Sequence, residues 1–133
     1  MITLNKTASD VYGLLLDNGF YPDTAKIITA QAAHETGNFT SSIFRYNNNC
    51  FGMKLPKTRK TLATGESRGH AVYNSVFDSV GDFWLWYQYV NLPHYWKDIE
   101  TYIGALKMKG YFEDSQDNYL KGVKRFYKLY FNE

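Results

Sequence analysis

Apolar residues recur at the i, i+3, i+4 spacing of an amphipathic helix in five stretches of this 133-residue chain. We expect these helices to begin near Thr7, Pro22, Ser79, Ile99 and Ser115. The helix-stopping residues that follow the first four are Gly19, Gly37, Pro93 and Gly110. The pattern therefore predicts a mainly α-helical protein.

Two segments between these helices lack the helical repeat. Residues 38–49 are polar and end in three consecutive asparagines, so we expect a loop there. In residues 54–73, Thr, Leu, Val and Tyr flank Gly65, Glu66 and Gly69, which indicates a short β-hairpin or an exposed loop. No internal repeat, low-complexity tract or linker divides the chain, so we expect one domain that spans residues 1–133.

The helix between Thr24 and Gly37 carries an acidic residue on its apolar stripe. This stripe consists of Ala25, Ile28, Gln31, Ala32 and Glu35. Glu35 falls in the last turn, where apolar neighbours and the negative end of the helix dipole both disfavour the ionised carboxylate. We therefore expect a raised pKa for Glu35, as a general acid near neutral pH requires. Spacing alone equally allows a helix-terminal glutamate that only reaches solvent.

The amino-acid composition narrows the class of ligand. Aromatic residues make up 18% of the chain, which suits a groove where rings stack against the apolar faces of sugars. The formal net charge of +2 is too small to indicate a nucleic-acid partner. The single cysteine, Cys50, excludes an internal disulfide, and a buried packing role is favoured over a thiol paired with His70 or His94.

Acidic residues suggest two kinds of chemistry. His34 and Glu35 match the start of a zinc-binding HExxH helix, but position 38 is Asn, so we expect no zinc and no other cofactor. A carboxylate pair is the stronger hypothesis, with Glu35 as the acid and Glu66 approaching it across a groove. Asp78 and Asp82 are the alternatives for the second role, although their positions are typical of helix N-terminal caps.

Four segments occur together and in order: AQAAHETGNF at 30–39, NNNCFGMK at 47–54, VYNSVFDSVGDF at 72–83 and GYFEDSQDNYLKGV at 110–123. In this combination the chain resembles the N-acetylglucosaminidases of glycoside hydrolase family 73 over roughly residues 20–130. The resemblance implies a lysozyme-like helical domain with a short β-hairpin beside the active-site groove. It also implies cleavage of the glycan strand of peptidoglycan after N-acetylglucosamine.

The resemblance further implies roles for individual residues. The catalytic acid of the family matches Glu35, and the family's second glutamate, on a flexible hairpin, is assigned to Glu66. A tyrosine that lines the cleft matches Tyr111. The positions expected to bind substrate are Asn48, Phe51, Tyr73 and Ser75, and Gly52 falls in the loop beside the acid.

The mechanism has several alternatives at this point. Inverting, retaining and substrate-assisted hydrolysis all stay open, because the separation of the carboxyl groups decides between the first two. Among enzymes, the nearest alternative function is that of a muramidase or a lytic transglycosylase. The alternative from another functional class is a catalytically silent cell-wall-binding or assembly module. Lys60 to His70 contains two glycines and no apolar anchor after Ala63, so we expect a mobile flap that brings Glu66 to the cleft when glycan binds.

The first residues show no basic stretch followed by a long apolar run, and no later stretch approaches the roughly 18 apolar residues of a membrane span. We therefore expect a monomer without membrane insertion whose Met1 is a true start. Its expected partner, peptidoglycan, lies outside the membrane. A phage-type lysis or virion system is favoured for delivery over a dedicated secretion route or a leader absent here.

Overall fold

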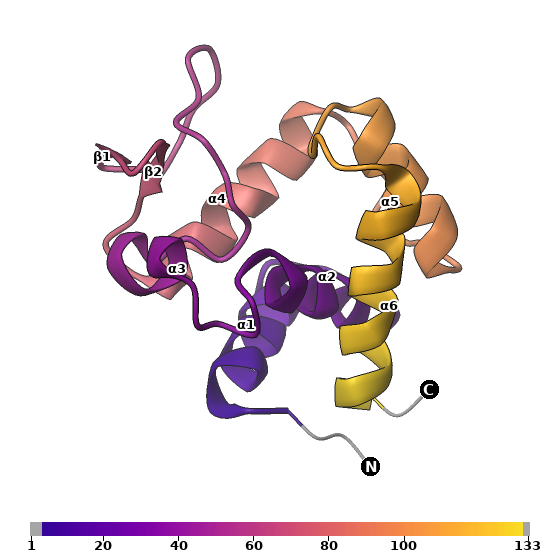
Figure 1. Cartoon of the computed structure of the whole chain (residues 1–133). Coiled ribbons are helices and arrows are strands. Elements are labelled where there is room, and N and C mark those ends of the chain that lie inside the picture. Colours follow the sequence, from indigo (N-terminus) through magenta and orange to yellow (C-terminus); the bar gives the residue numbers. More distant parts are fainter. Residues whose placement is uncertain (1–3, 132–133) are drawn as a thin grey trace.

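Six α-helices and one two-stranded antiparallel sheet make up residues 4–131, the part of the chain that the structure, a computed structural model, describes (Figure 1). The helices are α1 (Lys6–Asp17), α2 (Pro22–Glu35), α3 (Ser42–Asn47), α4 (Val76–Tyr89), α5 (Ile99–Met108) and α6 (Gln116–Phe131), and the strands are β1 (Gly65–Ser67) and β2 (His70–Val72). The predicted mainly α-helical, lysozyme-like class with a short hairpin is confirmed. Met1, the expected start, lies outside the described residues. Within them, no helix is long and apolar enough to cross a membrane.

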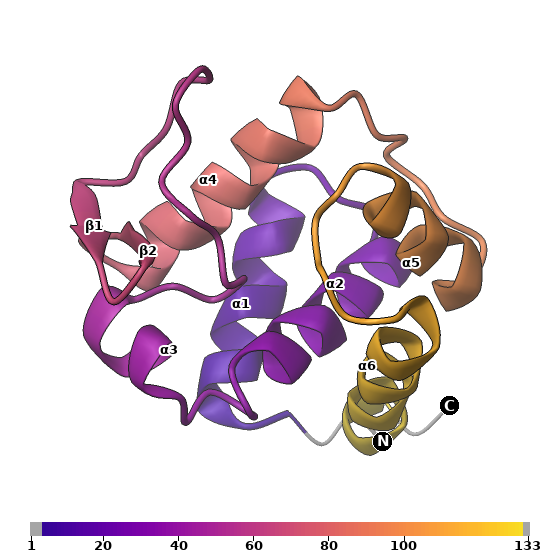
Figure 2. The same cartoon turned by 45° about the horizontal axis from the view of Figure 1, so that its top comes forward.

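Helix α2 lies in the middle of the molecule, between α1 and α6 (Figure 2). The predicted stripe is confirmed as buried, with Ala25, Ile28, Gln31 and Ala32 all fully inaccessible. Burial extends further than the stripe, because every residue from Thr24 to Ala33 except Lys26 is buried. The many Ala and Thr side chains of α2 let both neighbouring helices approach closely. The helix that carries Glu35 is therefore held on several sides.

Two helices begin at residues other than those predicted. Helix α1 is capped by Asn5 instead of Thr7, because the Asn5 side chain accepts a hydrogen bond from the Ala8 N–H at 2.7 Å. Helix α4 begins three residues before the predicted Ser79, with Ser75 as the cap that accepts from the Asp78 N–H at 3.1 Å. Both Ser75 and Ser79 are followed by Asp three residues later, so the local capping pattern did not distinguish them.

The segment 38–49, predicted as a loop, contains a short helix. Helix α3 begins after Ser41, whose side chain accepts from the Phe44 N–H at 3.2 Å, and ends at Asn48 in the left-handed conformation. The prediction was wrong here because a six-residue helix spans less than two turns, too few to show a hydrophobic repeat. Asn48 nevertheless has the left-handed backbone expected of the asparagine run, with φ of 54°.

The predicted hairpin is confirmed, and polar contacts hold it against the body of the protein. Strands β1 and β2 are joined by a two-residue turn at Arg68 and Gly69, which both have positive φ as a tight hairpin turn requires. The Asn47 side-chain amide donates to the Ser67 carbonyl at 2.8 Å, and the Ala71 N–H donates to the Met53 carbonyl at 3.0 Å. The mobility of this segment stays a prediction, but it has anchors that its apolar pattern did not indicate.

Asp82 ties the chain before the hairpin to α4. Its carboxylate accepts two hydrogen bonds from Arg59 at 3.0 Å each, and further bonds from the Leu62 N–H at 2.9 Å and the Tyr73 hydroxyl at 2.6 Å. Burial alone would raise the pKa of Asp82, but these donors hold it below its usual value. Its interpretation as a helix cap was wrong, since it is a buried anion inside α4.

Cys50 is a packing residue, as predicted. Its side chain is fully buried in the hydrophobic core, and its backbone N–H donates to the Ser79 hydroxyl at 2.9 Å. Burial raises the pKa of the Cys50 thiol to about 12, which leaves it a poor nucleophile.

Candidate active site

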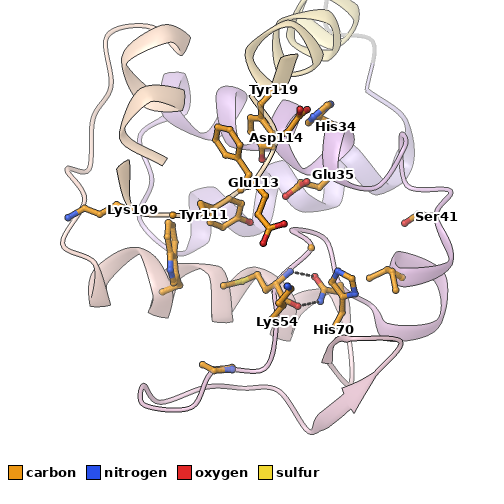
Figure 3. Close-up of a pocket in the computed structure, with 18 of the residues that line it drawn as sticks. His34, Glu35, Ser41, Lys54, His70, Lys109, Tyr111, Glu113, Asp114 and Tyr119 are labelled. Atoms are coloured by element: carbon orange, nitrogen blue, oxygen red, sulfur yellow. Dashed lines mark hydrogen bonds between the residues drawn. The ribbon is translucent and has the colours of Figure 1, made fainter. Parts of the chain in front are cut away.

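A cleft of about 610 Å³ lies between the hairpin side of the molecule and the connection from α5 to α6. Its lining comes from the end of α2, the loop after Phe51, Trp86 of α4, residues 109–114 and Tyr119 of α6 (Figure 3). Glu35 and Tyr111, two of the three residues predicted to be catalytic, both line this cleft. The third, Glu66, does not.

Glu35 sits at the last residue of α2, where the backbone of the neighbouring loop passes close to its carboxylate. A Cβ atom built on Gly52 would lie 3.3 Å from Glu35 Oε2, and Gly52 has a φ of +65°. Only glycine accommodates both this approach and this backbone conformation without strain. Gly52 thus lies beside the Glu35 carboxylate, as its place in the sequence predicted.

Burial raises the pKa of Glu35 to about 7, in agreement with the sequence-based expectation. The hydroxyl of Tyr119 faces the carboxylate and acts in the opposite direction, lowering the pKa. The net shift leaves a large protonated fraction at neutral pH. A proton donor of this kind at the wall of an open cleft has the properties of a general acid.

Tyr111 holds the loop that lies beside Glu35. Its hydroxyl donates to the Phe51 carbonyl at 2.6 Å, and its ring lies 4.8 Å from that of Trp86, centre to centre. Burial, followed by the charge of Glu35, raises the pKa of Tyr111 well above its usual value. Tyr111 is therefore a neutral hydrogen-bond donor beside the acid, and its ring forms part of an aromatic cleft wall with Trp86.

Tyr119 is a site residue that the sequence analysis did not identify. Its side chain is buried, and its ring stacks on that of Phe112 with 3.8 Å between the ring centres. The ring of His34 lies nearly perpendicular to that of Tyr119, with 4.8 Å between the ring centres. Among residues 4–131, its hydroxyl has no hydrogen bond of good geometry, although it faces Glu35. Tyr119 shares a helical face with the buried Val123 and Phe126, so its spacing indicated a core residue.

Asn48 and Tyr73 are both predicted to bind substrate. In this structure, their polar groups form hydrogen bonds within the protein. The Asn48 side-chain amide donates to the Tyr73 carbonyl at 2.9 Å, and the Tyr73 hydroxyl donates to Asp82 at 2.6 Å. Neither residue lines the cleft. Their role in substrate binding stays a prediction, while their role in joining α3, the hairpin and α4 is visible.

Phe51 and Ser75, the other two predicted binding residues, also lie outside the cleft lining. The Phe51 side chain is fully buried, and its ring stacks on that of Phe83 with 4.2 Å between the ring centres. Ser75 caps α4. For these two residues as well, contact with substrate stays a prediction.

Glu66 lies on β1 with an exposed side chain. In the antiparallel ladder it pairs with Ala71, so Glu66 and the buried Ala71 share one face of the hairpin. His70, the adjacent residue on β2, lines the cleft and therefore occupies the opposite face. The register thus directs Glu66 away from the face that borders the cleft.

Comparisons with known proteins place this chain in a family. The family model "Glucosaminidase: Mannosyl-glycoprotein endo-beta-N-acetylglucosaminidase" matches residues 21–131. Protein bax of Escherichia coli (strain K12) is 42% identical over 57 residues, which are 43% of this chain but only 21% of that protein. No solved structure matches the chain. Since the family model covers most of the chain, including Glu35 and the whole cleft lining, the chain belongs to the glucosaminidase family, glycoside hydrolase family 73, a family of glycoside hydrolases of the endo-β-N-acetylglucosaminidase type.

Proposed function

We propose that this protein hydrolyses the glycan strand of peptidoglycan at the bond after N-acetylglucosamine, with Glu35 as the general acid. The observation that carries the proposal is a carboxyl group with a pKa of about 7 at the wall of an open cleft. Family membership supports the substrate class. A cell-wall-binding module without activity would have no need to keep a carboxyl group in its protonated form, at a cost to stability.

The proposed reaction begins with protonated Glu35 donating its proton to the leaving glycosidic oxygen. The buried Tyr119 hydroxyl faces the same carboxylate and is placed to donate a hydrogen bond to it once the proton has left. This hydrogen bond would stabilise the ionised carboxylate that proton transfer produces. It would therefore lower the free energy of the later part of the reaction. Tyr111 supports the same group indirectly by fixing the Phe51 carbonyl next to Gly52.

The sequence-based assignment of the second catalytic role to Glu66 stays a prediction. In the observed register Glu66 faces away from the side of the hairpin that carries His70. To reach the cleft, β1 would have to twist or slip by one residue when glycan binds, because such a slip exchanges the two faces of a strand. Glu66→Gln tests this movement: a loss of about 10²-fold or more supports it, and a loss below about threefold rejects it.

The bond cleaved is tested by digestion of purified peptidoglycan, followed by borohydride reduction and mass spectrometry of the muropeptides. We expect reduced N-acetylglucosamine at the new ends. Reduced muramic acid would identify a muramidase, and an anhydro sugar would identify a lytic transglycosylase. Glu35→Gln, which removes the acid and keeps its size, is the matched inactive control.

The proposed substrate lies outside the cytoplasmic membrane, so the enzyme would act there. A phage-type delivery route is the version of this proposal that we favour from the sequence. Genes for lysis or virion proteins next to the coding sequence would support it. A flagellar or secretion operon in that place would contradict it.

A further inference from the structure

A second carboxylate lies in the same cleft as Glu35. Glu113, in the connection between α5 and α6, lines the cleft with an exposed side chain. Figure 3 shows this side chain entering the cleft beside Tyr111, on the same side as Glu35. No local pattern marks Glu113 as functional, because it follows the end of one helix and belongs to no periodic repeat.

The backbone on both sides of Glu113 is held in place. Lys107 Nζ donates to three successive carbonyl oxygens, those of residues 112, 113 and 114, at 3.4, 3.2 and 2.7 Å. Before Glu113, the Phe112 ring stacks on Tyr119 and the Tyr111 hydroxyl is bonded to Phe51. The position of Glu113 is therefore set by rigid contacts, while its carboxylate is left to move within the cleft.

The other carboxylates near the cleft are occupied or directed elsewhere. Asp114 accepts from the Ser115 N–H at 2.8 Å and from the Asn118 side chain at 3.5 Å, so it helps to begin α6. Asp82 is bound by Arg59 and its other donors, and Glu66 faces away. Within residues 4–131, no hydrogen bond or ion pair engages the Glu113 carboxylate. This carboxylate therefore has both access to the cleft and its full acceptor capacity, whereas Asp114 uses one of its oxygens within the protein.

We propose that Glu113 is the second catalytic carboxylate, the base that accepts a proton from the attacking water. This inference rests on the proposed function. In the step, Glu35 gives its proton to the glycosidic oxygen as the C1–O bond breaks. The water oxygen bonds to C1 and its proton passes to Glu113. The net change is the addition of one water to the bond, and exchange with solvent returns both carboxyl groups to their starting states.

The test compares Glu113→Gln with Asp117→Asn, an exposed carboxylate in the first turn of α6 that does not line the cleft. Both variants are assayed on intact peptidoglycan with folding checked by circular dichroism. For Glu113→Gln we expect kcat to fall by about 10²-fold or more with KM within about threefold, and we expect Asp117→Asn to keep most of its activity. A loss below about threefold, or one expressed only in KM, overturns the proposal.

A second variant separates a chemical role from a structural one. Glu113→Ala leaves space for a small anion, so added sodium formate should restore activity at least about tenfold if the missing group is a base. Formate should not restore Glu35→Ala, which lacks the acid. Inactive Glu113→Ala that formate does not restore overturns the proposal. If the parent protein releases no N-acetylglucosamine ends at all, it is the proposed function that fails.

Discussion

The two walls of the cleft are built by different means. The helical wall, formed by the end of α2, the α5–α6 connection and α6, rests on ring stacking and close helix packing around α2. The hairpin wall is held by hydrogen bonds that Asn47 donates to the β1 backbone and that Asp82 accepts from the segment before the hairpin. Burial shifts the pKa of Glu35 on the helical wall, whereas the side chain of Glu66 on the hairpin wall is solvent-exposed.

This difference shows where a small enzyme can place a group that needs an unusual pKa. Burial raises the pKa of a carboxyl group where apolar surroundings exclude water, and a two-stranded hairpin with three-residue strands has too little area to exclude it. The hairpin wall is suited to contact and movement, and the helical wall is suited to proton transfer. The following predictions test this division.

The largest expected effect is on the helical wall. Glu35→Gln should reduce hydrolysis of peptidoglycan by about 10²- to 10⁴-fold, because it removes the proton donor and leaves the shape of the cleft unchanged. Turnover is measured by release of reducing ends, and glycan binding by co-sedimentation with purified cell walls. A variant with turnover within about tenfold of the parent would exclude Glu35 as the acid.

A large effect on stability should come from the anchor of the hairpin wall. Asp82→Asn removes the charge that binds Arg59, and we expect the free energy of unfolding to fall by about 2–3 kcal/mol. Urea denaturation at neutral pH measures it, with Asp78→Asn in the first turn of α4 as the control. Because the folded-state pKa of Asp82 is depressed, its contribution is present above the unfolded pKa of about 3.9 and is lost as pH falls through the folded pKa. An equal loss at acidic pH would contradict the ionic origin.

A smaller effect concerns the pH dependence of stability that follows from the raised pKa of Glu35. Since the folded-state pKa of Glu35 is raised to about 7, the stability it contributes is fully present below its unfolded pKa and is lost as pH rises through 7. Glu35→Gln should therefore stabilise the protein at pH 8 by about 1–2 kcal/mol, after allowance for partial exposure, and by little at pH 4. Thermal denaturation at the two pH values measures the difference. A gain that is the same at both would show that Glu35 is not shifted by folding.

The smallest expected effect tests whether side chains in the helical wall are closely packed. A Cβ atom at Gly122 of α6 would overlap the ring of His34, which packs edge-on against Tyr119. Gly122→Ala should therefore be neutral or slightly destabilising, although Ala normally favours a helix by about 1 kcal/mol. In a His34→Ala background the same change should recover that gain. Additive effects in this double-mutant cycle would mean that the ring moves aside freely.

The local sequence was sufficient to predict an element wherever its pattern is typical of only one kind of structure. The helical repeats predicted α1, α2, α4, α5 and α6, and the glycine-flanked segment predicted the hairpin. Glu35 was singled out because it is a charged residue on an apolar stripe, and the family resemblance then assigned it the role of the acid. Gly110, with a φ of +72°, ends α5 as expected, since a positive φ strongly favours glycine.

Only the tertiary structure decided which of several equivalent local patterns was used, and which side chains meet. Ser75 and Ser79 have the same capping pattern, and the choice follows from Ser79 being buried against Cys50. The direction of Glu66 depends on strand register, and the access of Glu113 depends on Lys107 and on the stacking of Phe112 against Tyr119. The segments that make these contacts lie far from Glu35 in the sequence. A cleft is formed by residues from several elements, so no local periodicity contains it.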